Sequence, residues 1–253
     1  MWVSQVTDWD ERLTCGQGAR NKAVRLLSSL MSSAAAEGLR VGNPVAGFKA
    51  QDRVRAVERH EVFDEEQLAR LRASIEPRYA LLVDLLAYGL RLGEALALRR
   101  TDVNLKGDVT IRRTVVDLEG IMHYGPPKAA NGYRTLPLHH MREALFDHMA
   151  QYAQSEPDGL LFTAPEGGPV RAGLCRTRSF YEALERAELP RVVPHALRHR
   201  IACVLADEGE SDTAIAAWLG DTAAVVAKTY RNVLVRTNDR IAGRLAARYE
   251  VAR

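Results

Sequence analysis

The chain has 253 residues, 47% of them hydrophobic, and a formal net charge of only +3 at pH 7. This length suits one ordinary domain with a smaller one beside it, and the hydrophobic fraction is enough for a packed core. The small charge excludes a uniformly basic nucleic-acid coat, so any affinity for DNA requires arginines clustered on one face.

The first 44 residues contain one clear helical pattern. Apolar residues recur with a helical period between Gly18 and Glu37, the pattern ends at Gly38, and Asn43-Pro44 then breaks the chain. Residues 45–60 follow as a basic linker, whose cations are Lys49, Arg53, Arg55 and Arg59. Two interpretations of this linker stay open: a solvated connector, or a strap along a DNA backbone that adds salt-dependent affinity.

Helix signals are strong from residue 61 onward. Asp64-Glu65-Glu66-Gln67 has the cap residue and the acids that are typical of a first helical turn. Pro77 opens the next helix, whose apolar residues from 80 to 86 predict a buried face. We expect Gly89 to end this helix and to leave Arg91 at the start of the following one.

The pattern changes to β-branched alternation between Val109 and Leu138, with turn signals at Gly120, Gly125 and Gly132. We predict a small three-stranded antiparallel sheet here, with Lys128 on its last turn. The remainder predicts helices at about 139–154, 171–187, 194–208, 212–219 and from 223 onward. The predicted fold class is therefore mainly α with a small antiparallel β-sheet (α+β).

The sequence also indicates a compartment and a redox state. No apolar run reaches the about 18 residues that span a bilayer, and the N-terminus lacks a charged-then-apolar signal pattern. These observations predict a cytoplasmic protein. Cys15, Cys175 and Cys203 are odd in number and show no metal-ligand spacing, which favours reduced, packed thiols.

Five residues together provide the groups needed to cut a phosphodiester without a metal or a nucleotide cofactor. Attack on phosphorus spreads charge over the non-bridging oxygens, so the site needs fixed cations. A guanidinium, as in Arg91 and Arg198, grips two phosphate oxygens, whereas Lys128 is better suited as a general acid toward the leaving 5′ oxygen. The Tyr230 hydroxyl, with an unperturbed pKa near ~10, is a poor nucleophile until its proton is removed. His195 shares a helical face with Arg198 and could remove that proton or hold the phosphate.

Four boxes in the sequence resemble the tyrosine recombinases, the phage integrase family. The box from Tyr88 to Leu98 resembles the family's first-arginine box, which implies that Arg91 clamps phosphate and that Glu94 braces the site. The other three boxes are Gly125-Pro126-Pro127-Lys128 with Arg134-Thr135-Leu136-Pro137-Leu138, then His195-Ala196-Leu197-Arg198-His199, and then Leu219-Gly220-Asp221 with Tyr230 nine residues later. The resemblance covers most of the chain after the basic linker, and the order of the boxes makes it specific.

The resemblance implies a reaction, partners and a domain organisation. Tyr230 attacks a DNA phosphorus and leaves a 3′-phosphotyrosyl bond and a free 5′ hydroxyl, with no cofactor. The implied partners are double-stranded DNA recombination sites, with a homotetramer on paired sites and a monomer when free. Residues 1–44 correspond to a partial helical core-binding segment that clasps DNA, 45–60 to the basic linker and 61–253 to the catalytic domain. Because the family's core-binding domain has several helices and one is clear here, the chain is either short or begins inside a longer protein.

Asp221 departs from the family pattern. The family usually has a histidine or tryptophan here, which donates a hydrogen bond to the scissile phosphate. An ionised aspartate accepts but does not donate, and it repels phosphate. Three alternatives stay open: Asp221 is protonated, is turned onto Arg91 or Arg198, or slows the chemistry. We expect Arg91, Arg198 and His195 to converge on one phosphate position, with Asp221 on its rim.

Two rival functions fit parts of the sequence. The stretch from Ser211 to Gly220, followed by a second helix, also fits a helix-turn-helix, and so a DNA-binding module or a catalytically weakened or inactive relative of the family. A type IB topoisomerase-like enzyme would use the same chemistry to relax supercoils. The arginine boxes and the nine-residue gap before Tyr230 favour a recombinase.

Overall fold

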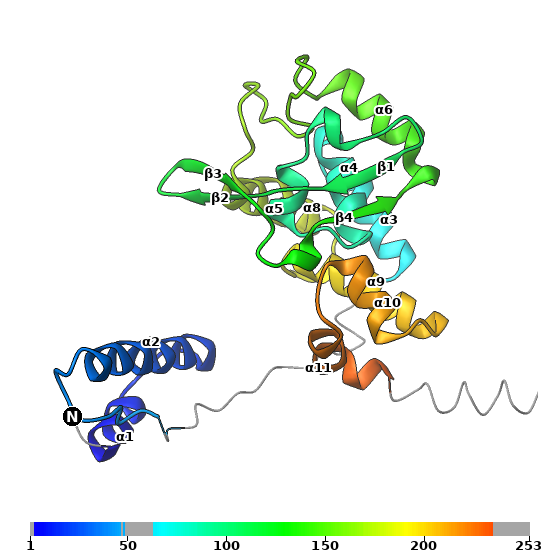
Figure 1. Cartoon of the computed structure of the whole chain (residues 1–253). Helices are drawn as coiled ribbons and strands as arrows, with labels where there is room; N and C mark the ends of the chain where they lie inside the picture. The colour runs from blue at the N-terminus through cyan, green and yellow to red at the C-terminus, as the bar shows by residue number, and fades with distance from the viewer. Residues whose placement is uncertain (1–2, 47, 49–62, 235–253) are drawn as a thin grey trace, which may run out of the picture. The chain divides into compact units, whose positions relative to one another are not determined.

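The computed structural model describes residues 3–46, 48 and 63–234 of the chain (Figure 1). The chain divides into two compact units, Met1–Arg55 and Ala56–Arg253. Most of the basic linker predicted at residues 45–60 lies outside the described residues, as do its four cations.

The first unit contains two described helices, α1 (Val3–Glu11) and α2 (Gln17–Ala36). The buried side chains of Val6, Val24 and Val45 form its small core. The prediction of a single helix is wrong, because α1 is short and offers few apolar positions from which to recognise a period. The bounds of α2 agree with the sequence pattern, and Gly38 follows it with a φ of 72°.

The second unit begins with the two helices that the sequence predicts. Helix α3 (Glu65–Ser74) has Asp64 as its N-cap, and Gln67 completes a capping box. Helix α4 (Pro77–Ala87) is mostly buried, and its apolar residues belong to the main core. Gly89 follows with a φ of 105°, and a Cβ there would lie 2.9 Å from Leu219 Cδ2, so the position favours glycine. Helix α5 (Leu92–Leu96) comes next, with Arg91 at its N-cap.

The strands form two separate antiparallel ladders. Strand β1 (Asp108–Ile111) pairs with β4 (Arg134–Pro137), and β2 (Thr114–Leu118) pairs with β3 (Ile121–Gly125) to make the hairpin that extends from the unit in Figure 1. The prediction of one three-stranded sheet is wrong in this respect. Between β1 and β2, Arg113 donates from Nη1 to Oδ2 of the buried Asp102 at 2.6 Å, and this pair coincides with the break between the ladders.

Helices make up most of the rest of the unit. They are η2 (Arg100–Asp102), η3 (Ala130–Gly132), η4 (His139–Met141), α6 (Arg142–Gln151), α7 (Ala172–Leu174), the π-helical η5 (Cys175–Phe180), α8 (Tyr181–Arg186), α9 (His195–Glu208), α10 (Asp212–Leu219) and α11 (Ala223–Leu234). Residues of α9, α10 and α11 share a second apolar cluster, which includes Ile201, Ile215 and Val226. Among the described residues, no helix is long and apolar enough to span a membrane. The predicted class, mainly α with a small antiparallel β part, is confirmed.

Candidate active site

Arg91 is held by the helix that it begins. Its main-chain N–H donates to Glu94 Oε2 at 3.0 Å, and its Nη1 donates to Glu94 Oε1 at 2.8 Å. Glu94 is only 2% exposed. Burial alone would raise the pKa of Glu94, but hydrogen bonds from Arg134 and Arg91 outweigh it and the pKa lies below its ordinary value. Glu94 is therefore a carboxylate that orients Arg91.

Arg134 is a residue to which sequence reasoning assigned no role. It starts β4, and its side chain is only 6% exposed. Its Nη2 donates to Glu94 Oε2 at 2.9 Å and its Nε donates to the carbonyl oxygen of Trp218 at 2.9 Å. Arg134 therefore connects β4 to the start of α5 and to the end of α10. The hairpin box contains Arg134, but no local signal indicates that its side chain is buried, because arginine is mostly exposed in proteins.

Arg198 approaches the same position from α9. It is 1% exposed, its Nη1 donates to the carbonyl oxygen of Gly89, and its Nη2 donates to Asp221 Oδ2 at 2.5 Å. Burial lowers the pKa of Arg198, the charge of Arg91 lowers it further, and Asp221 opposes both. A guanidinium nevertheless stays charged in proteins, so Arg198 is a buried cation that requires a counter-ion.

Asp221 supplies that counter-ion and bridges the two arginines. Its Oδ1 accepts from Arg91 Nη2 at 2.8 Å, and its Oδ2 accepts from Arg198. Of the alternatives left open by the sequence, the structure shows the carboxylate turned onto an arginine, and in fact onto both. Gly220 precedes it in the left-handed conformation, and a Cβ there would lie 2.6 Å from Arg134 Nη1. Only glycine fits this turn without displacing Arg134.

Lys128 lies at the same place on the surface. It is exposed, three residues beyond the end of β3, in the connection to β4. A cavity of about 320 Å³ is lined by Lys128 together with Arg91, Asn131 and Asp221. The hairpin lysine and the first arginine therefore line one cavity.

His195 begins α9, three residues before Arg198. Its ring centroid is 4.6 Å from that of His199, edge to face. Desolvation by the surrounding protein, followed by the neighbouring charges of His199, Arg198 and Arg91, lowers the pKa of His195 to about 4. Part of the His195 side chain is in contact with solvent. Because its pKa is lowered, its imidazole is neutral at pH 7 and has a nitrogen that can accept a proton.

Tyr230 lies in α11, nine residues after Asp221. Its side chain is outside the part of the chain that the structure describes. The described residues thus bring Arg91, Arg198 and Asp221 into direct contact. They place Lys128 on the same cavity, and they bring His195 close enough to be influenced by these charges.

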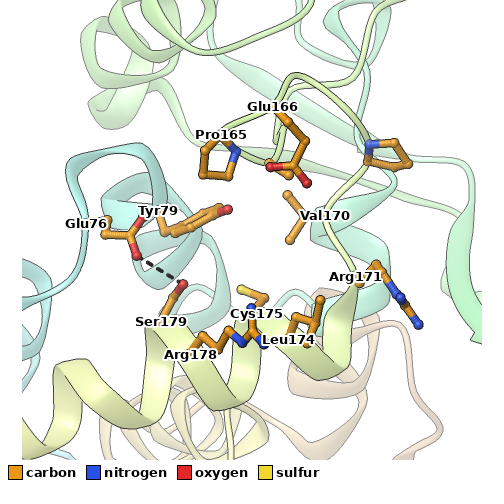
Figure 2. Close-up of a pocket in the computed structure, with 12 residues that line it drawn as sticks. Glu76, Tyr79, Pro165, Glu166, Val170, Arg171, Leu174, Cys175, Arg178 and Ser179 are labelled. Carbon is orange, nitrogen blue, oxygen red and sulfur yellow. Dashed lines mark hydrogen bonds between the residues drawn. The ribbon is translucent and has the colours of Figure 1, made fainter. Parts of the chain in front are cut away.

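A second cavity, of about 270 Å³, lies elsewhere in the same unit (Figure 2). Glu76 and Tyr79 come from the start of α4, and Cys175 and Ser179 come from η5. Ser179 Oγ donates to Glu76 Oε1 at 3.4 Å. Burial raises the pKa of Tyr79 and of Cys175 to about 12, so neither side chain is an ionised nucleophile at neutral pH. This cavity is not a candidate active site.

Comparison with known proteins agrees with the arrangement of the arginine boxes. Residues 61–236 match the model of the phage integrase family. The chain belongs to this family.

The chain is 29% identical over 233 residues to a protein of Mycobacterium tuberculosis (strain H37Rv) named as a prophage phiRv2 integrase, a match that covers 90% of this chain and 61% of the relative. It is 25% identical to a XerC-like tyrosine recombinase of Caldanaerobacter subterraneus, covering 86% of this chain and 64% of the relative. The chain therefore spans less than two thirds of these relatives.

Two solved structures share the fold. The Tn1549 transposon integrase in complex with transposon right end DNA matches with a TM-score of 0.80 at 18% identity, covering 96% of this chain and 86% of that chain. A λ integrase dimer bound to a COC′ core site matches with a TM-score of 0.63 at 15% identity, covering 90% of this chain and 79% of that chain.

Proposed function

We propose that this chain is the cleaving and rejoining part of a site-specific DNA recombinase. The observation that carries the proposal is the meeting of Arg91 and Arg198 at one carboxylate, beside a cavity that Lys128 also lines. Two guanidinium groups held at one point are suited to the two non-bridging oxygens of a phosphodiester. Family membership supports the same conclusion.

In the proposed reaction each group has one task. The Tyr230 hydroxyl attacks phosphorus, a phosphotyrosyl bond forms at the 3′ side, and the bond from phosphorus to the 5′ oxygen breaks. His195 accepts the tyrosine proton, since its imidazole is neutral at pH 7. Lys128 gives a proton to the leaving 5′ oxygen, and Arg91 and Arg198 balance the charge that develops on phosphorus oxygens. Attack by a 5′ hydroxyl reverses the step, so rejoining needs no ATP.

The proposed partners are duplex DNA sites, brought together in pairs by a homotetramer that forms from monomers on the DNA. Residues 1–44 and the basic linker at 45–60 contribute contacts to the DNA backbone in this proposal, and residues 61–253 perform the chemistry. Relatives whose names and descriptions refer to integrases and DNA complexes support these partners.

A covalent adduct with DNA tests the proposal. The protein is incubated in EDTA with a library of nicked duplexes of randomised sequence, and protein-bound strands are isolated under denaturing conditions and sequenced. We expect a tyrosine-linked 3′ strand with a recurring site, and its loss in Tyr230→Phe. Adducts that vanish in EDTA, or that persist in Tyr230→Phe, contradict the mechanism.

Asp221 favours a second candidate, a DNA-binding relative with weak or no cleavage, because its carboxylate occupies both arginines. This candidate predicts site-specific binding without adducts. A topoisomerase-like enzyme would instead relax supercoils without exchanging partners between two sites, so relaxation and two-site recombination assays run side by side separate the three functions.

A further inference from the structure

We infer that Asp221 acts as an internal phosphate, whose carboxylate fills the position between Arg91 and Arg198 and must leave before a DNA phosphate binds there. The inference rests on the proposed function, because it concerns the same two arginines. It makes Asp221 the residue that decides which anions reach the site.

The geometry of the bridge supports this role. Asp221 offers two oxygens on one carbon, and each takes one guanidinium: Oδ1 lies 2.8 Å from Arg91 Nη2, and Oδ2 lies 2.5 Å from Arg198 Nη2. A phosphodiester offers two non-bridging oxygens on one phosphorus, and guanidinium groups recognise both anions in the same way. The carboxylate and the phosphate therefore compete for the same donors.

The side chain of Asp221 can leave without moving its main chain. The main-chain N–H of Asp221 donates to the carbonyl oxygen of Ala216 at 2.9 Å, and its own carbonyl oxygen accepts from Asn131 Nδ2 at 3.0 Å. The side chain itself is 25% exposed and lines the cavity of about 320 Å³. A change of side-chain rotamer is thus enough to empty the position between the arginines.

The charges explain what this exchange selects. The cluster contains three guanidinium groups (Arg91, Arg134 and Arg198) and the carboxylates of Glu94 and Asp221, which leaves one net positive charge. An anion free in solution must displace a carboxylate that is tethered in place. A phosphate within a bound duplex is tethered as well, so it competes on equal terms. The site therefore excludes free phosphate and admits a phosphodiester that is presented by bound DNA.

Inorganic phosphate is the probe that tests this inference. Its affinity for the protein and its effect on the melting temperature are measured for the unmodified chain, Asp221→Asn and Asp221→Ser. Asp117→Asn is the matched control, because Asp117 also accepts from an arginine, Arg171, at 2.8 Å, but outside the cluster. We expect both Asp221 variants to melt at a lower temperature without phosphate and to bind phosphate about tenfold more tightly or better.

Three results would overturn the inference. The first is an affinity for phosphate that does not increase in the Asp221 variants, and the second is an equal increase in Asp117→Asn, which would indicate net charge alone. The third comes from the unmodified protein and does not depend on any variant. Arginine Nε–Hε signals of Arg91 and Arg198 should stay unchanged in NMR spectra when free phosphate is added, and a shift of both signals contradicts the inference. In the double variant Asp221→Asn with Arg91→Gln, the increase in phosphate affinity seen for Asp221→Asn should be lost.

The test of this inference can fail or succeed independently of the test of the proposed function. Tighter phosphate binding in Asp221→Asn, with no covalent adduct from any variant, supports the internal phosphate and contradicts the recombinase. Adduct formation that requires Tyr230, without a gain in phosphate binding, leads to the opposite conclusion.

Discussion

Two of the cavities in the second unit, the one lined by Lys128 and the one lined by Cys175, are similar in size, at about 320 and about 270 Å³, but they differ in the state of their ionisable groups. The first is lined by Arg91, a permanent cation held by Glu94 and Asp221, and lies near the neutral imidazole of His195. The second contains a thiol and a phenol whose pKa burial raises to about 12. Their volumes alone do not distinguish the two cavities. Under the proposed function, it is fixed charge with oriented donors that suits the first cavity to a phosphodiester.

The largest effect on stability is expected from Arg134, which binds Glu94 at the first cavity and the carbonyl oxygen of Trp218. Arg134→Gln leaves the buried Glu94 without one of its two guanidinium partners, which should lower the free energy of unfolding by about 3–5 kcal/mol. The matched change at the second cavity is Arg171→Gln, since Arg171 forms a half-exposed pair with Asp117, and it should lower the free energy of unfolding far less. Urea unfolding measures both. Equal losses would remove the contrast between the cavities.

The next effect concerns the rate of covalent-adduct formation. Arg198→Lys keeps a positive charge but loses the planar guanidinium, so it should lower the rate by about 10²–10³. Cys175→Ala changes the second cavity and should leave the rate within about twofold, because mutations at distant sites that share no partners act independently. The melting temperature of each variant shows whether folding is intact. If the Cys175→Ala variant is fully folded but forms the adduct slowly, the second cavity takes part in the proposed reaction.

A smaller effect of opposite sign is expected at Asp221. Asp221→His restores a donor and Asp221→Asn removes the repulsion, so both should raise the rate of adduct formation by about tenfold. Glu76→Gln removes a carboxylate from the second cavity and should leave the rate unchanged. Should both Asp221 variants be folded yet slower than the unmodified chain, Asp221 has a positive role in orienting the arginines.

The smallest effect is a difference in how stability depends on pH. The pKa of His195 is lowered from 6.5 to about 4, so its contribution is present above pH 6.5 and is lost as the pH falls toward 4. The pKa of Cys175 is raised from 9.0 to about 12, so its contribution is present below pH 9 and is lost as the pH rises toward 12. The slope for Cys175 is limited to about 1.4 kcal/mol per pH unit, and exposure makes that for His195 smaller.

Unfolding free energies measured across the pH range should therefore separate the cavities. His195→Asn should flatten the acid side of the profile, and Cys175→Ala should flatten the alkaline side. An acid side that is equally steep in His195→Asn would show that His195 has an ordinary pKa in the folded chain.

The sequence predicted those parts of the fold that depend on local signals. Asp64, Pro77 and Gly89 mark helix ends through backbone chemistry that involves few neighbours, and the structure has helix ends at these places. The strand partners were not predictable in this way, because β1 pairs with β4 across the hairpin that lies between them. The break between the ladders coincides with Arg113, whose partner Asp102 lies 11 residues earlier and is buried.

The candidate site shows the same limit. The boxes identified Arg91 and Arg198 as one set, and the structure joins them through Asp221. The burial of Arg134 had no local signal, since arginine is mostly exposed in proteins. That Asp221 would touch both arginines also depended on two long-range distances, which no spacing in the sequence encodes. The roles of Lys128, His195 and Tyr230 stay predictions.

The bridge between Arg91 and Asp221 spans 130 residues of the chain. During synthesis, Arg91 leaves the ribosome well before α9 and α10 exist, so a growing chain carries the first arginine without its second arginine or its carboxylate. Closing a loop of this length costs conformational entropy, and topologies rich in such contacts fold slowly. Under the proposed function, a nascent or prematurely released chain is unable to nick the genome that encodes it. Chain topology would by itself delay DNA breakage until the cleaving unit is nearly whole.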